Sequence, residues 1–433
     1  MPRSSDKPLT FIDAFAGCGG LSLGLMQAGW TGRFAIERDK FAFATLKTNL
    51  LSTGSPHKYV WPRWLPKEPI DIVELLNSYR TKLEEISGSV DVLVGGPPCQ
   101  GFSSAGRRKY DDPRNQLFAS YLTLVDIIKP KAVLIENVRG FTLDFTDGDE
   151  IKNFSLALKA RLSDAYTVYE HLLDLSIFGV PQARTRYFVL AFRSDLNVPN
   201  PFTHLQSRLP AFLRSLRLTV PVSSASAISD LEVGRSGTQP STESKGFKET
   251  HYAGPLTRYQ KLMNAGCEVP TDLRLARHAE DIEGRFKEII ELSHAEGRLN
   301  TNIGAEMRAR FGLKKLALRV LDPDRPSPTI TSMPDDLLHY SEPRTLTVRE
   351  NARLQSFPDW YSFQGKYTTG GHLRKQEVPR FTQVANAVPP LVARAIGETL
   401  TYLLRSKQAA STASGHEVSS RPHGIQQGTE ICA

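Results

Sequence analysis

Short apolar runs alternate with amphipathic segments over the first 195 residues of the chain. Such runs, rich in Val, Ile and Leu, are typical of strands buried in a mostly parallel sheet. In the segments between them, apolar residues recur every three or four positions, as in helices that pack one face on a sheet. The alternation predicts an α/β fold. Strands are expected at residues 10–16, 33–36, 90–94, 131–135, 166–175 and 187–192, and helices at 21–28, 39–49, 113–128 and 151–165.

The pattern changes near residue 196. Residues 197–270 are rich in Pro, Ser, Thr and Gly, and their apolar positions show little periodicity. This predicts a second, less regular domain, in which residues 277–292 form an amphipathic helix. Regular order returns at residues 390–404, which carry a helical stripe, and the polar residues after them predict a disordered tail.

A glycine-rich turn follows the first predicted strand, and an acidic residue ends the second. The turn is Gly17-Cys18-Gly19-Gly20, and the acidic residue is Glu37. Glycines let a ligand approach the backbone at a helix N-terminus, and a carboxylate there can accept hydrogen bonds from two ribose hydroxyls. The turn lacks the full G-x-G-x-x-G spacing, so a tight structural turn is the alternative. A nucleotide-like ligand is favoured, and the carboxylate suits a neutral or cationic one better than a polyphosphate.

Cys99 lies just beyond the predicted strand at 90–94, after the sequence Gly95-Gly96-Pro97-Pro98. The prolines fix the backbone φ angle, and the glycines leave room for another group to approach. Open α/β sheets bind their ligands at the carboxyl ends of their strands. A thiolate in this position is a candidate nucleophile, whereas an inert buried cysteine is the alternative.

Two carboxylates are expected near the same crevice. Glu136 ends the predicted strand at 131–135, so it should face the crevice beside Cys99. Asp71 is expected on a strand-end segment, residues 69–72, facing the same pocket. For Asp71, an ordinary surface position is the alternative.

Two groups of cations are further candidates for ligand contacts. Arg184 and Arg186 lie on one side of an extended segment. They suit a planar polar ligand or a phosphate, with an edge-strand ion pair as the alternative. Arg107 and Arg108 follow Ser103 in a polar segment that suits phosphate contacts, with a solvated loop as the alternative.

The composition narrows the class of protein. Lys and Arg together number 54 against 46 Asp and Glu, a net charge of +8 that permits a nucleic-acid partner without demanding one. The four cysteines have no paired spacing, so neither a disulfide framework nor a zinc site is expected, and no metal. The N-terminus lacks a signal-peptide pattern, and no apolar run approaches the roughly 18 residues of a membrane helix. A cytoplasmic protein is therefore expected.

In their order along the chain, these motifs resemble those of the DNA (cytosine-5) methyltransferases, especially of the bacterial restriction-modification type. The resemblance extends from about residue 9 to residue 404 around a variable middle. Ala385 stands where the last motif usually has glycine, which is a small change. The matching segments are Phe15-Ala16-Gly17-Cys18-Gly19-Gly20, Glu37, Asp71-Ile72, Gly96-Pro97-Pro98-Cys99-Gln100, Glu136-Asn137-Val138, Gln182-Ala183-Arg184-Thr185-Arg186, and residues 325–329, 349–358 and 383–389.

The resemblance implies an S-adenosyl-L-methionine (SAM)-dependent methyltransferase (Rossmann-like) sheet with a smaller, irregular target-recognition domain. Residues 1–195 with 375–404 would form the catalytic domain, 196–374 the recognition domain and 405–433 a disordered tail. The implied reaction moves a methyl group from SAM to C5 of a cytosine flipped out of a specific double-stranded DNA sequence. The protein would be a bacterial monomer that protects DNA in a restriction-modification system, whose endonuclease would act separately. A tRNA cytosine-5 methyltransferase of the same architecture is the alternative, but the long variable domain favours DNA.

The resemblance also implies roles for individual residues. Cys99 would attack C6 of cytosine, and Glu136, with a raised pKa, would interact with N3. Arg186, together with Arg184, would contact O2 of the base or orient the residues around it, and no residue is assigned to remove the C5 proton. Residues 103–109 would close over the flipped base. SAM would bind Phe15, Ala16, Gly17, Gly19, Gly20, Leu21, Glu37, Asp71, Ile72, Pro97, Asn386 and Val388, and DNA would contact Ser103, Arg107 and Arg108.

Overall fold

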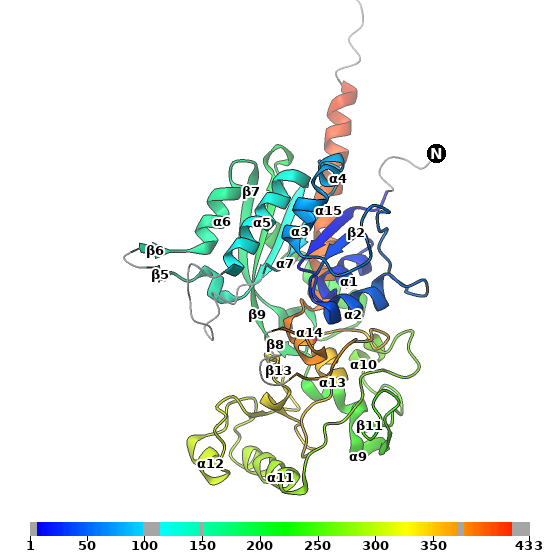
Figure 1. Ribbon diagram of the computed structural model, residues 1–433, viewed down its shortest axis with the longest axis vertical. Helices are drawn as coiled ribbons and strands as arrows, with labels where there is room; N and C mark the ends of the chain where they lie inside the picture. Colours follow the sequence, from blue (N-terminus) through cyan, green and yellow to red (C-terminus); the bar gives the residue numbers. More distant parts are fainter. Residues whose placement is uncertain (1–6, 98–112, 148–149, 370–375, 418–433) are drawn as a thin grey trace, which may run out of the picture.

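A six-stranded mixed sheet forms the centre of the upper body in Figure 1, a ribbon view of the computed structural model. The structure describes residues 7–97, 113–147, 150–369 and 376–417. The strands lie in the order β2-β1-β3-β4-β9-β7; the first four are parallel, and β9 runs antiparallel to both its neighbours. Their bounds are β1 (Thr10–Ala14), β2 (Thr31–Ile36), β3 (Val92–Gly95), β4 (Ala132–Asn137), β7 (Tyr166–Asp174) and β9 (Thr185–Arg193).

The register brings the carboxyl ends of four strands to one edge of the sheet. Ala14 at the end of β1 pairs with Ile36 of β2 and with Gly95 of β3, and Gly95 pairs with Ile135 of β4. The residues that follow these positions therefore lie side by side. β1 lies between β2 and β3, and such a switch point is where open sheets bind their ligands.

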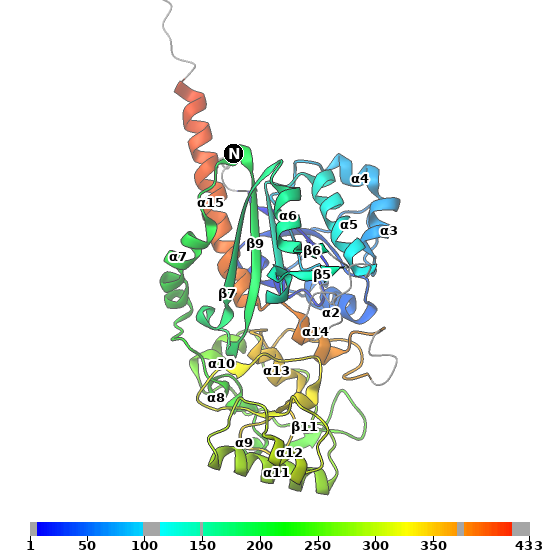
Figure 2. The same cartoon turned by 90° about the vertical axis from the view of Figure 1, so that its left-hand side faces the viewer.

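Helices cover both faces of the sheet. On one face lie α1 (Gly20–Gln27), α2 (Lys40–Leu50), α7 (Pro201–Leu216) and α15 (Pro390–Glu417); on the other lie α3 (Ile72–Ser78), α4 (Arg80–Glu85), α5 (Pro113–Ile128) and α6 (Phe154–Leu162). Alternate strand residues point to opposite faces. Phe11 and Val92 belong to the core beneath α1 and α15, whereas Ile12 and Leu93 belong to the core beneath α5 and α6. Figure 2 shows the two helical layers on either side of the sheet.

Helices α1 and α15 pack closely because glycines face the contact. A Cβ at Gly24 of α1 would lie 2.4 Å from the Pro390 carbonyl oxygen, and one at Gly397 of α15 would lie 2.8 Å from Cβ of Ala28. Only residues without a side chain allow this approach. Trp30 reinforces the contact, since its Nε1 donates to the Gly397 carbonyl oxygen at 3.0 Å. The two ends of the chain therefore form one layer of the upper body.

The lower body of Figure 1, residues 217–347, consists of short elements joined by loops. One part has its own core, in which Phe286 and Ile289 pack with Val320 and Leu338. The helices and strands of the whole lower body are α8 (Ser224–Ile228), α9 (Val233–Ser236), α10 (Arg258–Met263), α11 (Glu280–Ala295), α12 (Ala305–Arg310), β10 (Thr238–Pro240), β11 (Lys248–Thr250), β12 (Arg319–Val320), β13 (Ser327–Pro328) and β14 (Leu337–Leu338).

Helices α13 (Val348–Leu354) and α14 (Arg380–Asn386) lie where the two bodies meet (Figures 1 and 2). The large core of the upper body continues into the lower body there, through Tyr259 and Ile330. The remaining short elements are β5 (Phe145–Asp147), β6 (Glu150–Lys152), β8 (Gln182–Ala183) and 3-10 helices at Arg139–Thr142, Leu175–Phe178, Ser194–Leu196, Ser229–Leu231 and Pro334–Asp336.

The structure differs from two local expectations of the sequence. Residues 69–72 are not a strand end, because Asp71 caps helix α3 and its Oδ1 accepts the Val73 amide at 2.8 Å. Aspartate is a favoured residue at helix N-termini for this reason. For residues 405–417, where the sequence predicts disorder, the structure continues helix α15 to Glu417. Lys, Gln and Ala in that segment favour a helix.

Helix α7 lies in a region whose composition predicted irregular structure. Asn200 caps the helix and Pro201 occupies its first turn, both common at helix N-termini. Its buried residues include Phe202 and Phe212, and the helix packs against α15 and β7. The change of composition near residue 196 therefore does not coincide with a change of packing.

Candidate active site

A cavity of about 400 Å³ opens at the carboxyl edge of the sheet. Its wall combines the ends of β1 to β4 with residues from the far end of the chain. The predicted site residues that line it are Phe15, Ala16, Gly17, Leu21, Glu37, Asp71, Ile72, Pro97, Glu136, Arg184, Arg186, Asn386 and Val388. The predicted residues Cys99, Ser103, Arg107 and Arg108 lie outside the described residues.

The turn after β1 has a backbone that favours glycine. Gly17 and Gly19 have φ angles of 56° and 90°, and Phe15 has a left-handed φ of 60°. For a residue with a side chain this conformation is costly, and it persists only where the surroundings impose it. Such strain is common at functional sites.

Gly19 and Gly20 of this turn are not among the residues that line the cavity; they pack behind it. A Cβ at Gly20 would lie 2.4 Å from the Val388 carbonyl oxygen, and one at Gly19 would lie 2.8 Å from the Tyr361 hydroxyl. Both glycines are therefore needed for close packing of the turn against residues that follow much later in the chain.

Glu37 is fixed by two backbone amides. Its Oε2 accepts a hydrogen bond from the Gly17 amide at 2.8 Å, and its Oε1 accepts one from the Asp39 amide at 2.7 Å. Burial raises the pKa of Glu37, an effect that these two hydrogen bonds oppose. A carboxylate has about four lone-pair directions, so Glu37 keeps acceptor capacity for hydroxyl groups in the cavity.

Glu136 and Arg186 form an ion pair at the other end of the cavity. Arg186 Nε lies 3.2 Å from Glu136 Oε1, and the two side chains are 14% and 13% exposed. Burial raises the pKa of Glu136, and Arg186 and Arg184 only partly oppose this. A Cβ at Gly96 would lie 3.4 Å from Glu136 Oε2, so the segment after β3 passes beside this carboxyl group.

Arg184 is buried in the wall of the cavity. Its Nη2 donates to the Ala385 carbonyl oxygen at 3.0 Å, and its Nε has no partner among the described residues. Burial, with a smaller contribution from Arg186, lowers the pKa of Arg184 to about 9, so the guanidinium remains charged at neutral pH.

A buried pair of glutamines supports this wall. Gln182 Nε2 donates to Gln355 Oε1 at 2.6 Å, and Gln355 Nε2 donates to the Ala387 carbonyl oxygen at 2.7 Å. These side-chain amides therefore join three motifs that are distant in the sequence, at residues 182–186, 349–358 and 383–389. Removing either amide would leave buried carbonyl groups without partners, which is costly.

Sequence reasoning missed several lining residues. Ile330, Thr331 and Ser332 reach the cavity because β13 pairs with β8, with Ser327 opposite Gln182. The motif at 325–329, which directly precedes them, is the signal that could have found them. The other missed lining residues include Arg38, Val378 and Gln383.

Cys18 also lines the cavity, but its thiol is engaged in packing. Its Sγ donates to the Gln383 carbonyl oxygen at 3.5 Å, and burial raises the pKa of the Cys18 thiol to about 12. A thiol that stays protonated is a poor nucleophile. Cys18 is therefore not a rival to Cys99 for that role.

In the part of the chain that the structure describes, no three His, Cys, Asp or Glu side chains are grouped to bind a metal ion. None of the helices over the same residues is both long and apolar enough to cross a membrane.

Sequence comparison finds relatives over nearly the whole chain. A family model described as C-5 cytosine-specific DNA methylase matches residues 9–401. The Type II methyltransferase M.DdeI of Desulfomicrobium norvegicum is 31% identical over an aligned length of 403 residues, and the match covers 91% of this chain and 89% of that protein. The Type II methyltransferase M.XorII of Xanthomonas oryzae pv. oryzae is 30% identical over 411 residues, covering 92% of this chain and 85% of that protein.

Structure comparison finds the same architecture. A crystal structure of a prophage-encoded protein of E. coli, described as a DNA modification methyltransferase, matches with a TM-score of 0.62 and 24% identity. The match covers 92% of this chain and 99% of that one. At this identity the likeness establishes the fold.

Proposed function

We propose a site and a mechanism for this chain, which belongs to the C-5 cytosine-specific DNA methylase family. The protein is a DNA (cytosine-5) methyltransferase of the type found in restriction-modification systems. One observation carries our assignment of the site. A single cavity joins the glycine turn and Glu37 to the Glu136–Arg186 pair, with Pro97 in its wall shortly before Cys99.

The half of the cavity beside the glycine turn suits S-adenosyl-L-methionine. Glu37 has acceptor capacity left for the ribose hydroxyls, and the carboxyl groups of Glu37 and Asp71 lie in this wall, which suits a cationic sulfonium. When bound, SAM supplies the methyl group. The residues proposed to hold it are Phe15, Ala16, Gly17, Leu21, Glu37, Asp71, Ile72, Pro97, Asn386 and Val388, with Gly19 and Gly20 supporting the turn from behind.

Cys99 is the proposed nucleophile. C5 of cytosine is a weak nucleophile, so the ring must be activated before it can accept a methyl group. Attack of the Cys99 thiolate on C6 makes C5 enamine-like, which divides one difficult step into two easier ones. After transfer, C5 loses its proton and the thiolate leaves, which restores the aromatic ring.

Glu136 is the proposed partner of N3. Attack at C6 places negative charge on the ring, and a protonated carboxyl group beside N3 can neutralise it. The raised pKa of Glu136 favours the protonated form that this role requires. Arg186 lies 3.2 Å from the same carboxyl group, and we assign it, with Arg184 behind it, to orient this group and to contact O2 of the base.

The lower body is proposed to read the DNA sequence. Base pairs are distinguishable in the major groove, where irregular loops can reach their edges. The target cytosine must leave the duplex to enter the cavity. Ser103, Arg107 and Arg108 are proposed to contact the phosphates around the flipped base.

A cognate endonuclease that acts separately is the proposed biological partner. The name Type II methyltransferase of M.DdeI and M.XorII supports this proposal. We further propose a cytoplasmic monomer. The tRNA alternative has less support, because the matching family is one of DNA methylases.

Methyl transfer from labelled SAM to two substrates tests the proposed function. The full chain is incubated with tritium-labelled SAM and either duplex DNA or tRNA. We expect label in DNA and none in tRNA, and label in tRNA alone would contradict the proposal. Bisulfite sequencing of DNA from cells that express the protein then identifies the recognition sequence and the methylated cytosine.

A further inference from the structure

The glycine turn is contacted from behind by the hydroxyl group of Tyr361. This hydroxyl donates a hydrogen bond to the Cys18 carbonyl oxygen. A Cβ at Gly19 would lie 2.8 Å from the hydroxyl oxygen of Tyr361. Tyr361 is fully buried, and burial raises the pKa of its hydroxyl well above the ordinary value, so the group remains a donor. The position of the turn and that of Tyr361 therefore depend on each other.

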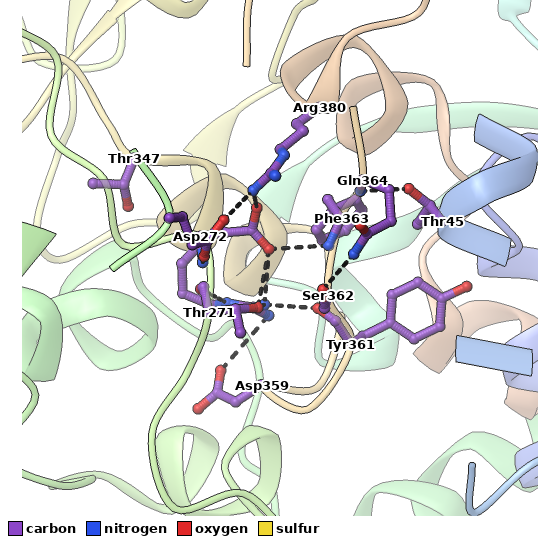
Figure 3. A network of polar contacts seen from close by, with 12 residues as sticks. Thr45, Thr271, Asp272, Thr347, Asp359, Tyr361, Ser362, Phe363, Gln364 and Arg380 are labelled. Carbon is purple, nitrogen blue, oxygen red and sulfur yellow. Dashed lines mark hydrogen bonds and ion pairs between the residues drawn. The ribbon is translucent and has the colours of Figure 1, made fainter. Parts of the chain in front are cut away.

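Arg349 on α13 holds the backbone around Tyr361, and Figure 3 labels its partners Thr271, Asp272 and Tyr361. Its Nη2 donates to the Tyr361 carbonyl oxygen at 2.6 Å, and its Nη1 donates to that of Pro358 at 3.1 Å. The same guanidinium reaches the lower body, where Nε donates to the Thr271 carbonyl oxygen at 2.9 Å and Nη2 lies 3.4 Å from Asp272 Oδ2. A planar guanidinium with this many buried partners has little freedom to move.

Asp272 extends the cluster within the lower body. Its Oδ1 accepts a hydrogen bond from Arg380 at 2.7 Å, and its Oδ2 accepts one from the Phe363 amide at 3.0 Å. Its own amide donates to Glu243 at 2.7 Å, and Glu243 pairs with Arg380. The left-handed φ of 66° at Asp272 requires such surrounding contacts in a residue other than glycine.

These contacts form an unbroken buried route of four residues: Cys18, Tyr361, Arg349 and Asp272. The route begins in the wall of the cavity and ends in the lower body. A network of this kind couples two sites when ligands at both sites favour the same arrangement of its members. A ligand on the turn would hold the Cys18 carbonyl where Tyr361 reaches it, and a ligand on the lower body would hold the segment around Asp272.

We propose that Tyr361 and Arg349 are positioning residues that couple SAM binding at the glycine turn to DNA binding by the lower body. This inference rests on the proposed function, because it needs SAM and DNA as the two ligands. By thermodynamic linkage, each ligand should then tighten binding of the other by the same factor. Coupling between sites commonly amounts to about 5- to 150-fold.

The coupling is measured with S-adenosyl-L-homocysteine, which lacks the transferable methyl group. Its Kd is determined by calorimetry with the full chain, alone and with a duplex that carries the recognition sequence. The ratio of the two Kd values is the coupling factor. Y361F removes only the hydroxyl group, and we expect it to lower this factor by about threefold or more.

Y259F is a matched control. Tyr259 is also a buried tyrosine, and its hydroxyl donates to the Arg353 carbonyl oxygen at 2.6 Å without contacting the glycine turn. We expect Y259F to keep the coupling factor of the wild type. A reduced affinity for S-adenosyl-L-homocysteine that is the same with and without DNA would mean a merely structural role for Tyr361, and would overturn the inference.

T271V tests the contacts of Arg349 in the lower body. It also keeps the inference testable if the Y361F protein does not fold. Thr271 is exposed, and its hydroxyl accepts a hydrogen bond from Arg349 Nη2 at 3.2 Å. We expect T271V to lower the coupling factor, and the double variant to lose less than the two single losses combined, because Tyr361 and Thr271 both contact Arg349.

The outcomes distinguish this inference from the proposed function. An unchanged coupling factor in Y361F and T271V, with methyl transfer to DNA intact in the wild type, would overturn the inference alone. A wild-type protein that neither binds S-adenosyl-L-homocysteine nor methylates DNA would overturn the proposed function, and the inference with it.

Discussion

The side-chain amide of Asn137 donates a hydrogen bond to the carbonyl oxygen of Pro97, with 3.3 Å between the two atoms. Asn137 is 3% exposed, and its Oδ1 accepts the Val138 amide at 2.8 Å, so its orientation is fixed. The contact holds the loop that leads from β3 toward Cys99 against the strand that carries Glu136. A side chain with no proposed chemical role thus joins the end of β4, which carries Glu136, to the segment after β3, which leads to the proposed nucleophile.

N137A should lower kcat by about 10- to 100-fold, because small errors in the placement of reacting groups are costly. SAM affinity should fall less than kcat, since Pro97 is the one proposed SAM-binding residue in this contact. Steady-state kinetics and calorimetry measure the two quantities. N153A is the control: Asn153 donates to the Thr142 carbonyl oxygen at 3.1 Å and does not line the cavity. Equal kcat values for N137A and N153A would contradict the prediction.

C99A should keep SAM binding and lower methyl transfer by a factor on the order of 10⁴ or more, because it removes only the covalent step. The measurements are calorimetry with SAM and transfer of a tritiated methyl group to duplex DNA. C267A is the matched control, since Cys267 is outside the cavity wall. Turnover of C99A at the wild-type rate would exclude the covalent mechanism.

E136Q should lower kcat by about 10²- to 10⁴-fold, because glutamine keeps a hydrogen-bond donor but has no proton to give. Burial raises the pKa of Glu136, so its carboxyl group loses its proton at a higher pH than an exposed glutamate does. Wild-type kcat should therefore fall as pH rises through this pKa, and E136Q should lack that fall. Single-turnover rates over a pH series measure both effects.

The control for Glu136 is E170Q. Glu170 pairs with Lys159 at the surface and does not line the cavity. The E170Q substitution should leave kcat and the pH dependence of kcat unchanged. An E136Q protein with the pH profile of the wild type would show that another group titrates.

R353M should lower the free energy of unfolding by about 3–5 kcal/mol, because it removes the guanidinium group that lies between two buried carboxylates. Arg353 is fully buried between Asp230 and Asp359. Burial opposes ionisation of Asp359, but its pairing with Arg353 outweighs this and lowers its pKa. The stability that this pair contributes is present above the ordinary pKa of aspartate and is lost as pH falls through the lowered one. The difference in the free energy of unfolding between R353M and the wild type should therefore become smaller at acidic pH.

Urea unfolding at several pH values measures the effect of R353M. R161M is the control, because Arg161 pairs with Asp126 where both side chains are about half exposed. Exposed pairs contribute about 1 kcal/mol or less. A loss of stability in R161M as large as that in R353M would contradict the argument from burial.

The sequence was sufficient to predict the residues at the carboxyl edge of the sheet. Glu37, Pro97 and Glu136 each follow a short apolar run, and parallel strands bring such positions together whatever the loops between them do. Local patterns therefore indicated which residues meet. The resemblance to a known family added the chemistry that those residues carry.

Contacts between distant segments were not predictable in this way. Thr331 and Ser332 reach the cavity through a two-residue strand pairing, which is too short to leave a periodic signal. Asp71 was expected near the pocket, but its function as a helix cap depends on where the backbone turns. Gln355 and Arg349 make contacts across 173 and 78 residues of sequence, and only the folded chain shows which groups they meet.

The packing of α1 on α15 has a consequence for how the protein is made. Gly20 and Gly24 lie against Val388 and Pro390, so the turn after β1 is supported by residues that are synthesised much later. While the chain is still being translated, the glycine face of α1 has no partner, and the pocket lacks Asn386 and Val388. The nascent protein therefore cannot complete the proposed methyl-donor site until α14 and the start of α15 have left the ribosome, and a chain terminated before α15 would leave this face of α1 open to water.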